Sequence, residues 1–202
     1  MAAAAARAVS ARSRGASSRF GSSAALELPA TLTDGAVVLR QFEEDDRAEV
    51  LRTMRDPLVR RWLNMPARPR DADFDTLVRL AADGRRAGSR FDYAVVDRPG
   101  GAAVGAVIAS RRHRENYELA YLAGPAGRGR GLMSAALRVL CDALFAAGAG
   151  RLEIRTHPAN EESQRLAERC GFVREGVERR SIWVHGQRED AVVWSLLPDD
   201  VR

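Results

Sequence analysis

Lysine is absent from this chain of 202 residues, in which all 32 basic residues are arginine. Isoleucine and asparagine occur only three times each, so residue types with AT-rich codons are scarce, as is typical of a GC-rich genome. A protein without lysine cannot form a Schiff base with pyridoxal phosphate, and it lacks the lysine of a phosphate loop or a protein kinase. The sequence therefore excludes these three kinds of enzyme chemistry.

Cysteine and histidine are also scarce. The two cysteines, Cys141 and Cys170, lie 29 positions apart without a second pair, so the sequence indicates neither a disulfide framework nor a zinc ribbon. The three histidines, His113, His157 and His185, lack the spacing of zinc ligands. We therefore expect no metal site, and unpaired thiols favour a reducing compartment and a cytoplasmic location.

Long hydrophobic runs are missing as well. The longest uncharged apolar run, residues 102–109, is far too short to cross a bilayer. Apolar residues make up 46% of the chain, which is typical of a globular protein, and the chain is long enough for one domain with a sizeable core. The sequence thus predicts a single domain with no role at a membrane.

Basic charge is concentrated at the start of the chain. Residues 1–25 hold four arginines and no acid, which leaves 28 arginines against 27 acids in the other 177 residues. A nucleic-acid-binding domain keeps a basic excess in its folded part, so we expect no nucleic-acid partner. The composition of residues 1–25 predicts a disordered Ala/Ser/Arg-rich leader, with a transit peptide or an overlong start site as alternatives. We assign the folded domain to residues 26–202.

The hydrophobic pattern from residue 26 onward predicts both strands and helices. The strongest helical pattern covers residues 132–147, with Leu137, Leu140 and Leu144 on one face and Gly148 just past its end. Residues 61–66 are interpreted as an irregular stretch. Strands are predicted at 36–42, 91–97, 102–110, 116–123, 151–156, 173–184 and 189–197, and further helices at 44–55, 71–84 and 160–170.

A glycine-rich turn, Arg128-Gly129-Arg130-Gly131-Leu132-Met133, connects a predicted strand to the long helix. Glycines let main-chain amides turn toward a ligand, and a helix N-terminus offers unpaired N–H groups and a partial positive charge. Arg128 and Arg130 could add charge-assisted contacts. The pattern indicates an anion cradle suited to a pyrophosphate, or else a solvated loop with surface arginines. It is not a dinucleotide-binding fingerprint, because the order of the glycines differs.

Several short motifs follow one another in the order and spacing of one family. They are Leu39-Arg40, Glu43-Glu44-Asp45-Asp46, Glu118-Leu119-Ala120-Tyr121-Leu122, the glycine turn, Asn160-Glu161-Glu162-Ser163, Cys170-Gly171-Phe172 and the final strand from Asp190 to Leu196. With these motifs, residues 37–197 resemble the GCN5-related N-acetyltransferases (GNAT), specifically their RimJ/RimL-type branch of ribosomal-protein N-acetyltransferases. The resemblance implies an α/β GNAT fold: a mixed, mostly antiparallel sheet of six to seven strands, flanked by about four helices and splayed between the fourth and fifth strands.

The resemblance also implies acetyl-CoA as the acyl donor. In that family the turn binds the CoA pyrophosphate through main-chain amides, which here implicates Arg128, Gly129, Arg130, Gly131, Leu132 and Met133. Leu122 and Ala123 would pair with the pantetheine arm and offer an amide to the thioester oxygen. Asn160 and Ser163 would line the gap where CoA inserts. Met133 departs from the family pattern, which has a small residue there, and could crowd the phosphate.

Acid–base candidates lie near this expected gap. Glu118 is the candidate base, acting through water, and its alternative role is that of a strand carboxylate paired with arginine. Many family members protonate the thiolate from a tyrosine whose position here is Ala167, so Ser163 is the expected substitute and Tyr121 the second candidate. Ser163 could instead cap a helix through backbone amides. Trp62 is the candidate wall of the acceptor cleft, with core packing as the alternative.

The predicted function is transfer of an acetyl group from acetyl-CoA to a primary amine by direct attack in a ternary complex. The acceptor is a protein N-terminal α-amine or a small amine such as an antibiotic, and a different acyl-CoA could serve as donor. A non-catalytic module that binds acyl-CoA as a regulatory ligand is the alternative. The resemblance also implies a homodimer. Because the chain has no lysine, any acetyl mark on itself is restricted to its N-terminus, a hydroxyl or a thiol.

Overall fold

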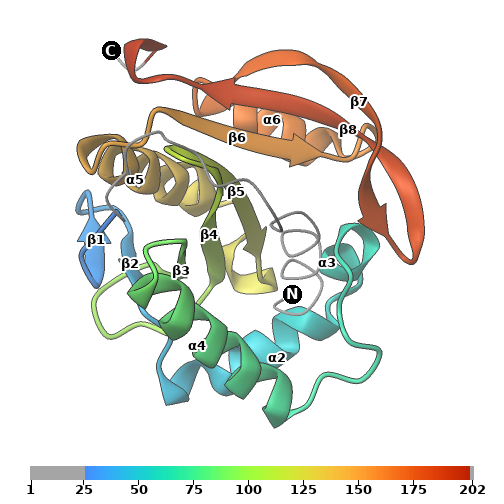
Figure 1. Ribbon diagram of the computed structural model, residues 1–202. Helices are drawn as coiled ribbons and strands as arrows, with labels where there is room; N and C mark the ends of the chain where they lie inside the picture. Colours follow the sequence, from blue (N-terminus) through green and yellow to red (C-terminus); the bar gives the residue numbers. More distant parts are fainter. Residues whose placement is uncertain (1–25, 201–202) are drawn as a thin grey trace.

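One eight-stranded sheet forms the centre of the protein (Figure 1). The computed structural model describes residues 26–200, so the predicted leader lies outside the described residues. The strands run in the order β1-β2-β3-β4-β5-β6-β8-β7, and every neighbouring pair is antiparallel except β5 and β6. Their bounds are β1 (Thr31–Thr33), β2 (Val38–Arg40), β3 (Arg90–Val96), β4 (Gly105–His113), β5 (Asn116–Ala123), β6 (Arg151–Thr156), β7 (Val173–Val184) and β8 (Gln187–Leu196).

The predicted fold class, a mixed and mostly antiparallel α/β architecture, is confirmed. The sheet has one strand more than the resemblance implied, because the short strand β1 pairs with β2 at its outer edge. Within residues 26–200 the helices are α2 (Arg47–Arg55), α3 (Pro57–Trp62), α4 (Asp71–Arg86), α5 (Leu132–Ala146) and α6 (Glu161–Arg169). None of these helices is long and apolar enough to span a membrane.

Helix α3 corrects one prediction, because it extends to Trp62 and so enters the stretch predicted to be irregular. The Asp56 carboxylate caps it by accepting the N–H groups of Leu58 and Val59 at 3.0 and 3.1 Å. Pro57 occupies the first helical position, where its missing N–H costs nothing. The Asp-Pro pair is therefore a helix start signal that the periodicity of so short a segment did not reveal.

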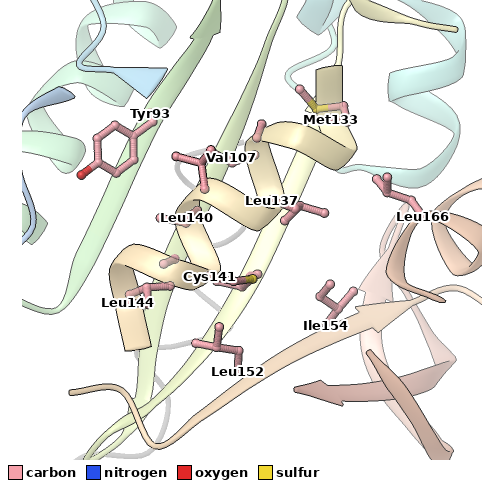
Figure 2. Close-up of a cluster of buried hydrophobic side chains, with 14 of the residues drawn as sticks. Tyr93, Val107, Met133, Leu137, Leu140, Cys141, Leu144, Leu152, Ile154 and Leu166 are labelled. Atoms are coloured by element: carbon pink, nitrogen blue, oxygen red, sulfur yellow. The ribbon is translucent and has the colours of Figure 1, made fainter. Parts of the chain in front are cut away.

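The main core lies on the face of the sheet that α5 covers. In Figure 2, Leu137, Leu140 and Leu144 of α5 lie between Val107 of β4 on one side and Leu152 and Ile154 of β6 on the other, and all are fully buried. Their spacing on α5 explains the strong helical pattern in the sequence, since residues three and four apart share one helix face. Burial of this apolar stripe is the main reason that α5, and therefore its N-terminal turn, has a fixed position.

A second, smaller core lies on the opposite face, beneath α2 and α4. It contains Leu51 and Met54 of α2 and Phe74 and Leu77 of α4. Strand β5 serves both faces by alternation: Tyr117 and Leu119 pack in the α5 core, whereas Leu122 faces α2 and α4. Successive side chains at the end of β5 therefore face α5 on one side of the sheet and α2 and α4 on the other.

The sheet separates between β5 and β6. These parallel strands pair from Asn116 with Arg151 to Leu119 with Ile154, and their pairing then stops although both strands continue. Within the described part of the chain, the edge of β5 from Ala120 to Ala123 has no strand beside it on this side. The predicted splay is thus present. It lies between the fifth and sixth strands, not the fourth and fifth, because β1 adds one strand before them.

The β7–β8 hairpin curves toward the end of α3 (Figure 1), and one side chain holds the two together. Asn64, just beyond α3, donates from Nδ2 to the Trp183 carbonyl and accepts the His185 N–H at Oδ1, both at 2.6 Å. These two bonds fix the hairpin tip over the same face of the sheet that α2 and α4 cover.

Candidate active site

The predicted anion cradle has a backbone that only glycine adopts readily. Gly129 and Gly131 have φ angles of 70° and 74°, in the left-handed region, and a Cβ on either would meet no atom within 4 Å. The N–H groups of Ser134 and Ala135 both bond to the Gly131 carbonyl at 3.1 Å. No N–H group of residues 129–133 donates to an acceptor within residues 26–200, so these N–H groups at the start of α5 are available as donors.

Both arginines of the cradle are paired with carboxylates. Arg128 holds the Asp56 carboxylate through two N–H groups, and Arg130 donates to Asp97 at 2.8 Å. Each guanidinium lowers the pKa of its partner carboxyl below the usual range. These pairs neutralise part of the arginine charge, which leaves the main-chain N–H groups of the turn as its unpaired donors among the described residues. Because Asp56 also caps α3, the Arg128 pair connects the cradle to the opposite layer.

Met133 does not occupy the cradle. Its side chain is 8% exposed and belongs to the α5 core (Figure 2), close to Gly105 of β4. The bulk of the Met133 side chain is therefore taken up by core packing.

Two predicted acid candidates lie against each other across the splay. The Tyr121 hydroxyl is 2.8 Å from Ser163 Oγ and donates to the Ser163 carbonyl at 3.0 Å. Burial raises the pKa of Tyr121 to about 12, so the phenol keeps its proton at neutral pH. This contact joins the unpaired end of β5 to the first turn of α6.

The role of helix cap belongs to Asn160 rather than Ser163. Asn160 Oδ1 accepts the Ser163 N–H at 3.2 Å, which is the bond that caps α6. The alternative in which Ser163 caps the helix is therefore wrong, and its hydroxyl is left to contact Tyr121. Asn160 follows β6 and precedes α6, and its side-chain oxygen is engaged in the helix cap.

Glu118 is a strand carboxylate paired with arginine, which is the alternative to the role of base. Its Oε2 accepts a hydrogen bond from Arg155 Nη1 and forms an ion pair with Arg112 Nε, both at 3.1 Å, and Arg155 also donates to Glu153 at 2.7 Å. Glu118 precedes Leu122 by four strand residues, which corresponds to about 13 Å along β5. One carboxylate oxygen, Oε2, is thus paired with two arginines, and Glu118 lies about 13 Å along β5 from the predicted thioester position.

Trp62 lies at the mouth of the gap, beside a histidine that the sequence reasoning overlooked. The Trp62 ring centroid is 5.0 Å from that of His157, and Arg61 covers the same indole at 4.7 Å. His157 Nδ1 accepts the Ala159 N–H at 3.0 Å, so neutral imidazole carries its hydrogen on Nε2 and is a donor there. If the β5–β6 register continued across the splay, His157 would stand opposite Leu122. In the sequence, His157 was considered only as a possible zinc ligand, and histidine spacing carries no information about its place beside Trp62.

No group of three or more histidine, cysteine, aspartate or glutamate side chains within the described residues could hold a metal ion. Fold and site together define an α/β protein with a gap between two parallel strands and a glycine-rich helix N-terminus at its end. A family model described as "Acetyltransferase (GNAT) domain" matches residues 36–173. The chain belongs to the GNAT acetyltransferase family.

Named relatives agree with this assignment. "Probable N-acetyltransferase YjcK" from Bacillus subtilis (strain 168) is 34% identical over 84 residues, which cover 41% of this chain and 46% of that protein. The chain thus spans about half the length of the curated relatives it matches. Mycobacterium smegmatis RimJ, solved in complex with CoA-disulfide, gives a TM-score of 0.74 at 20% identity and covers 85% of this chain and 87% of that one. Ribosomal-protein-S5-alanine acetyltransferase from Vibrio fischeri gives a TM-score of 0.72 at 22% identity. The match covers 86% of this chain and 100% of that one. At such identities the structures establish the fold.

Proposed function

We propose that the protein is an acetyl-CoA-dependent N-acetyltransferase that acts on a protein N-terminal α-amine by direct attack in a ternary complex. The observation that carries the proposal is the Tyr121–Ser163 hydroxyl pair, which bridges the splayed strands beside the unpaired edge of β5. A site that only held acyl-CoA would need no proton donor there. Family membership and a structural neighbour solved with a CoA derivative support the choice of donor.

The CoA pyrophosphate would bind at the start of α5. The N–H groups of residues 129–133 lack acceptors in the described chain, and the α5 N-terminus adds a partial positive charge. The pantetheine arm would then take the place of a strand beside Leu122 and Ala123. An amide of this edge would donate to the thioester oxygen, where charge develops during attack.

The reaction forms one C–N bond and breaks one C–S bond, and its net proton transfer is from the amine nitrogen to the sulfur. The neutral amine attacks the thioester carbonyl carbon, and collapse of the tetrahedral intermediate breaks the C–S bond to release the CoA thiolate. Ser163 would donate its hydroxyl proton to this thiolate. Tyr121 would then turn its own proton from the Ser163 carbonyl to Ser163 Oγ and replace it across their 2.8 Å contact. The acetylated nitrogen passes its surplus proton through water to Tyr121, which restores the phenol, so the products are an amide and CoA thiol.

The acceptor is best matched by an α-amine. Its ordinary pKa of about 8 leaves a useful neutral fraction without a dedicated base, whereas a lysine amine near 10.4 needs one. This fits a site in which Glu118 is engaged by two arginines. The name of the Vibrio fischeri neighbour, a ribosomal-protein acetyltransferase, also favours a protein acceptor.

An acceptor panel tests this choice. We expect acetylation of peptides with a free α-amine and no lysine, and at least tenfold slower reaction of α-blocked peptides that contain one lysine. Product mass and fragment ions locate the acetyl group. Faster turnover of small polyamines or aminoglycosides than of any peptide would contradict a protein acceptor and favour the small-amine alternative.

Replacement of Glu118 by glutamine separates its two candidate roles. Since its carboxylate is paired and distant from Leu122, we expect kcat to fall less than about tenfold, and by the same factor between about pH 6 and pH 9. Steady-state rates across this range, with the melting temperature as a folding control, provide the measurement. A much deeper loss at low pH than at high pH would instead identify Glu118 as the base.

A further inference from the structure

Arg128 of the glycine turn reaches from the start of α5 to the start of α3. Its guanidinium engages both oxygens of the Asp56 carboxylate: Nη1 donates to Oδ2 at 3.2 Å, and Nη2 donates to Oδ1. The Asp56 side chain is 12% exposed and that of Arg128 is 31% exposed, so the pair is largely shielded from solvent. A two-pronged contact between arginine and carboxylate fixes orientation as well as distance. The pair therefore sets where α3 begins relative to the turn.

Helix α3 depends on contacts at its two ends. It has six residues, all within the described part of the chain, and among them only Val59 is buried. A helix of this length is not stable in isolation, so its position is set by the groups that hold it. At its start these are the cap and the ion pair of Asp56. At its end the Trp62 ring lies against that of His157, which directly follows β6. A shift of Asp56 therefore moves Trp62 relative to the gap.

Arg130, two residues farther along the same turn, forms a pair with a different destination. It donates to Asp97 at 2.8 Å, and Asp97 directly follows β3. Strand β3 is held between β2 and β4, on the side of the sheet away from β6. The pair of Arg130 therefore does not reach α3 or Trp62. The two arginines carry the same charge near the same helix N-terminus, and they differ in the element that each one holds.

We propose that Arg128 is a positioning residue for the amine acceptor, because it holds α3 and Trp62 against the gap through Asp56. The main-chain N–H groups of the turn are left to bind the pyrophosphate. This inference rests on the proposed function, in which donor and acceptor meet at the gap. Transfer of the guanidinium to a phosphate would leave the mostly buried Asp56 carboxylate without its cation, which is costly. The pair thus persists when CoA binds.

Two substitutions remove the pair, one from each side. Arg128→Met removes the positive charge, and Asp56→Asn removes the negative charge but keeps the helix cap, since asparagine caps as well as aspartate. For each variant we expect KM for a lysine-free peptide with a free α-amine to rise about tenfold, because the displaced wall contacts the acceptor less well. We expect kcat to stay within about threefold of native, because Tyr121 and Ser163 are unchanged.

The double variant and a matched control show whether the pair acts as one unit. Arg128→Met combined with Asp56→Asn should have the same peptide KM as either single variant, because the second change removes no further contact. Arg130→Met is the control, since it removes the same charge from the same turn and breaks the pair with Asp97. We expect its peptide KM within about twofold of native, and a change in the Kd for CoA equal to that in Arg128→Met. KM and Kd do not scale with the amount of folded protein.

Direct binding of CoA by Arg128 would give the opposite pattern. Arg128→Met would then weaken CoA binding at least about tenfold more than Arg130→Met does, and Asp56→Asn would tighten it by releasing the guanidinium. That pattern, or an equal rise in peptide KM in Arg128→Met and Arg130→Met, would overturn the proposal.

Asp56→Asn decides the question alone if Arg128→Met does not fold, because it breaks the pair and leaves the turn intact. A rise in peptide KM with unchanged CoA affinity supports the positioning role, whereas tighter CoA binding with an unchanged peptide KM contradicts it. Absence of turnover by the native protein with every amine would instead contradict the proposed function.

Discussion

Replacement of Ser163 by alanine is expected to lower kcat about 100-fold and to leave the Kd for CoA within about threefold of native. The variant removes the hydroxyl that we place beside the leaving thiolate, whereas the α6 cap depends on Asn160 and is unaffected. Tyr121→Phe removes the phenol behind it and should cost about tenfold. Burial raises the pKa of Tyr121 to about 12, so the phenol stays protonated and this loss should be similar at all pH values used for assays.

The double variant distinguishes a relay from two independent contributions. If Tyr121 acts only through Ser163, the double variant should be no slower than Ser163→Ala alone, because effects within one unit are not additive. Ser195→Ala is the control, since this serine also makes a 2.8 Å hydrogen bond, to Glu175, but lies on β8 away from the gap. A kcat for Ser163→Ala close to native, or a loss equal to that of Ser195→Ala, would contradict the proton-donor role.

Replacement of Gly131 by valine is expected to weaken CoA binding at least about tenfold, which corresponds to about 1.4 kcal/mol. At a φ of 74° a β-branched residue is strained by about 1 to 2 kcal/mol, and relief of that strain turns the N–H groups of residues 129–133 away from the anion. Titration calorimetry with free CoA measures this effect without requiring turnover.

Gly186 provides a closely matched control for this variant. It has a φ of 79°, and a Cβ there would also meet nothing within 4 Å, but it lies at the tip of the β7–β8 hairpin. Gly186→Val should therefore lower the melting temperature about as much as Gly131→Val while the Kd for CoA stays within about twofold. Equal weakening of CoA binding in both variants would show that the cradle is not the anion site.

Local patterns in the sequence were sufficient for much of the fold. The predicted bounds of β5 and β6 agree with Asn116–Ala123 and Arg151–Thr156, because alternation and turn residues act within a few positions. The predicted splay beside them, which the family resemblance supplied, is also present. Helix α3 was missed because six residues are too few to display a helical period, although Asp56 and Pro57 carry its start signal.

The contacts that give the site its chemistry could not be predicted in this way. Tyr121 and Ser163 were separate candidates for one role, and only the packing of α6 against β5 brings their hydroxyls together across 42 positions. The pairing of Arg128 with Asp56 joins residues 72 positions apart and depends on how α3 packs against the cradle. Such contacts follow from tertiary packing, which sequence periodicity does not specify.

Release of CoA thiol tests the central claim, that the gap between β5 and β6 supports acetyl transfer to an amine. The native protein is mixed with acetyl-CoA, with and without a lysine-free peptide that has a free α-amine, and free thiol is measured over time. We predict peptide-dependent thiol release matched one to one by acetylated peptide, with double-reciprocal plots that intersect, as direct attack in a ternary complex requires. Tight binding of acetyl-CoA without amine-stimulated thiol release, across peptides and small amines alike, would contradict the account and identify the protein as a non-catalytic acyl-CoA-binding module.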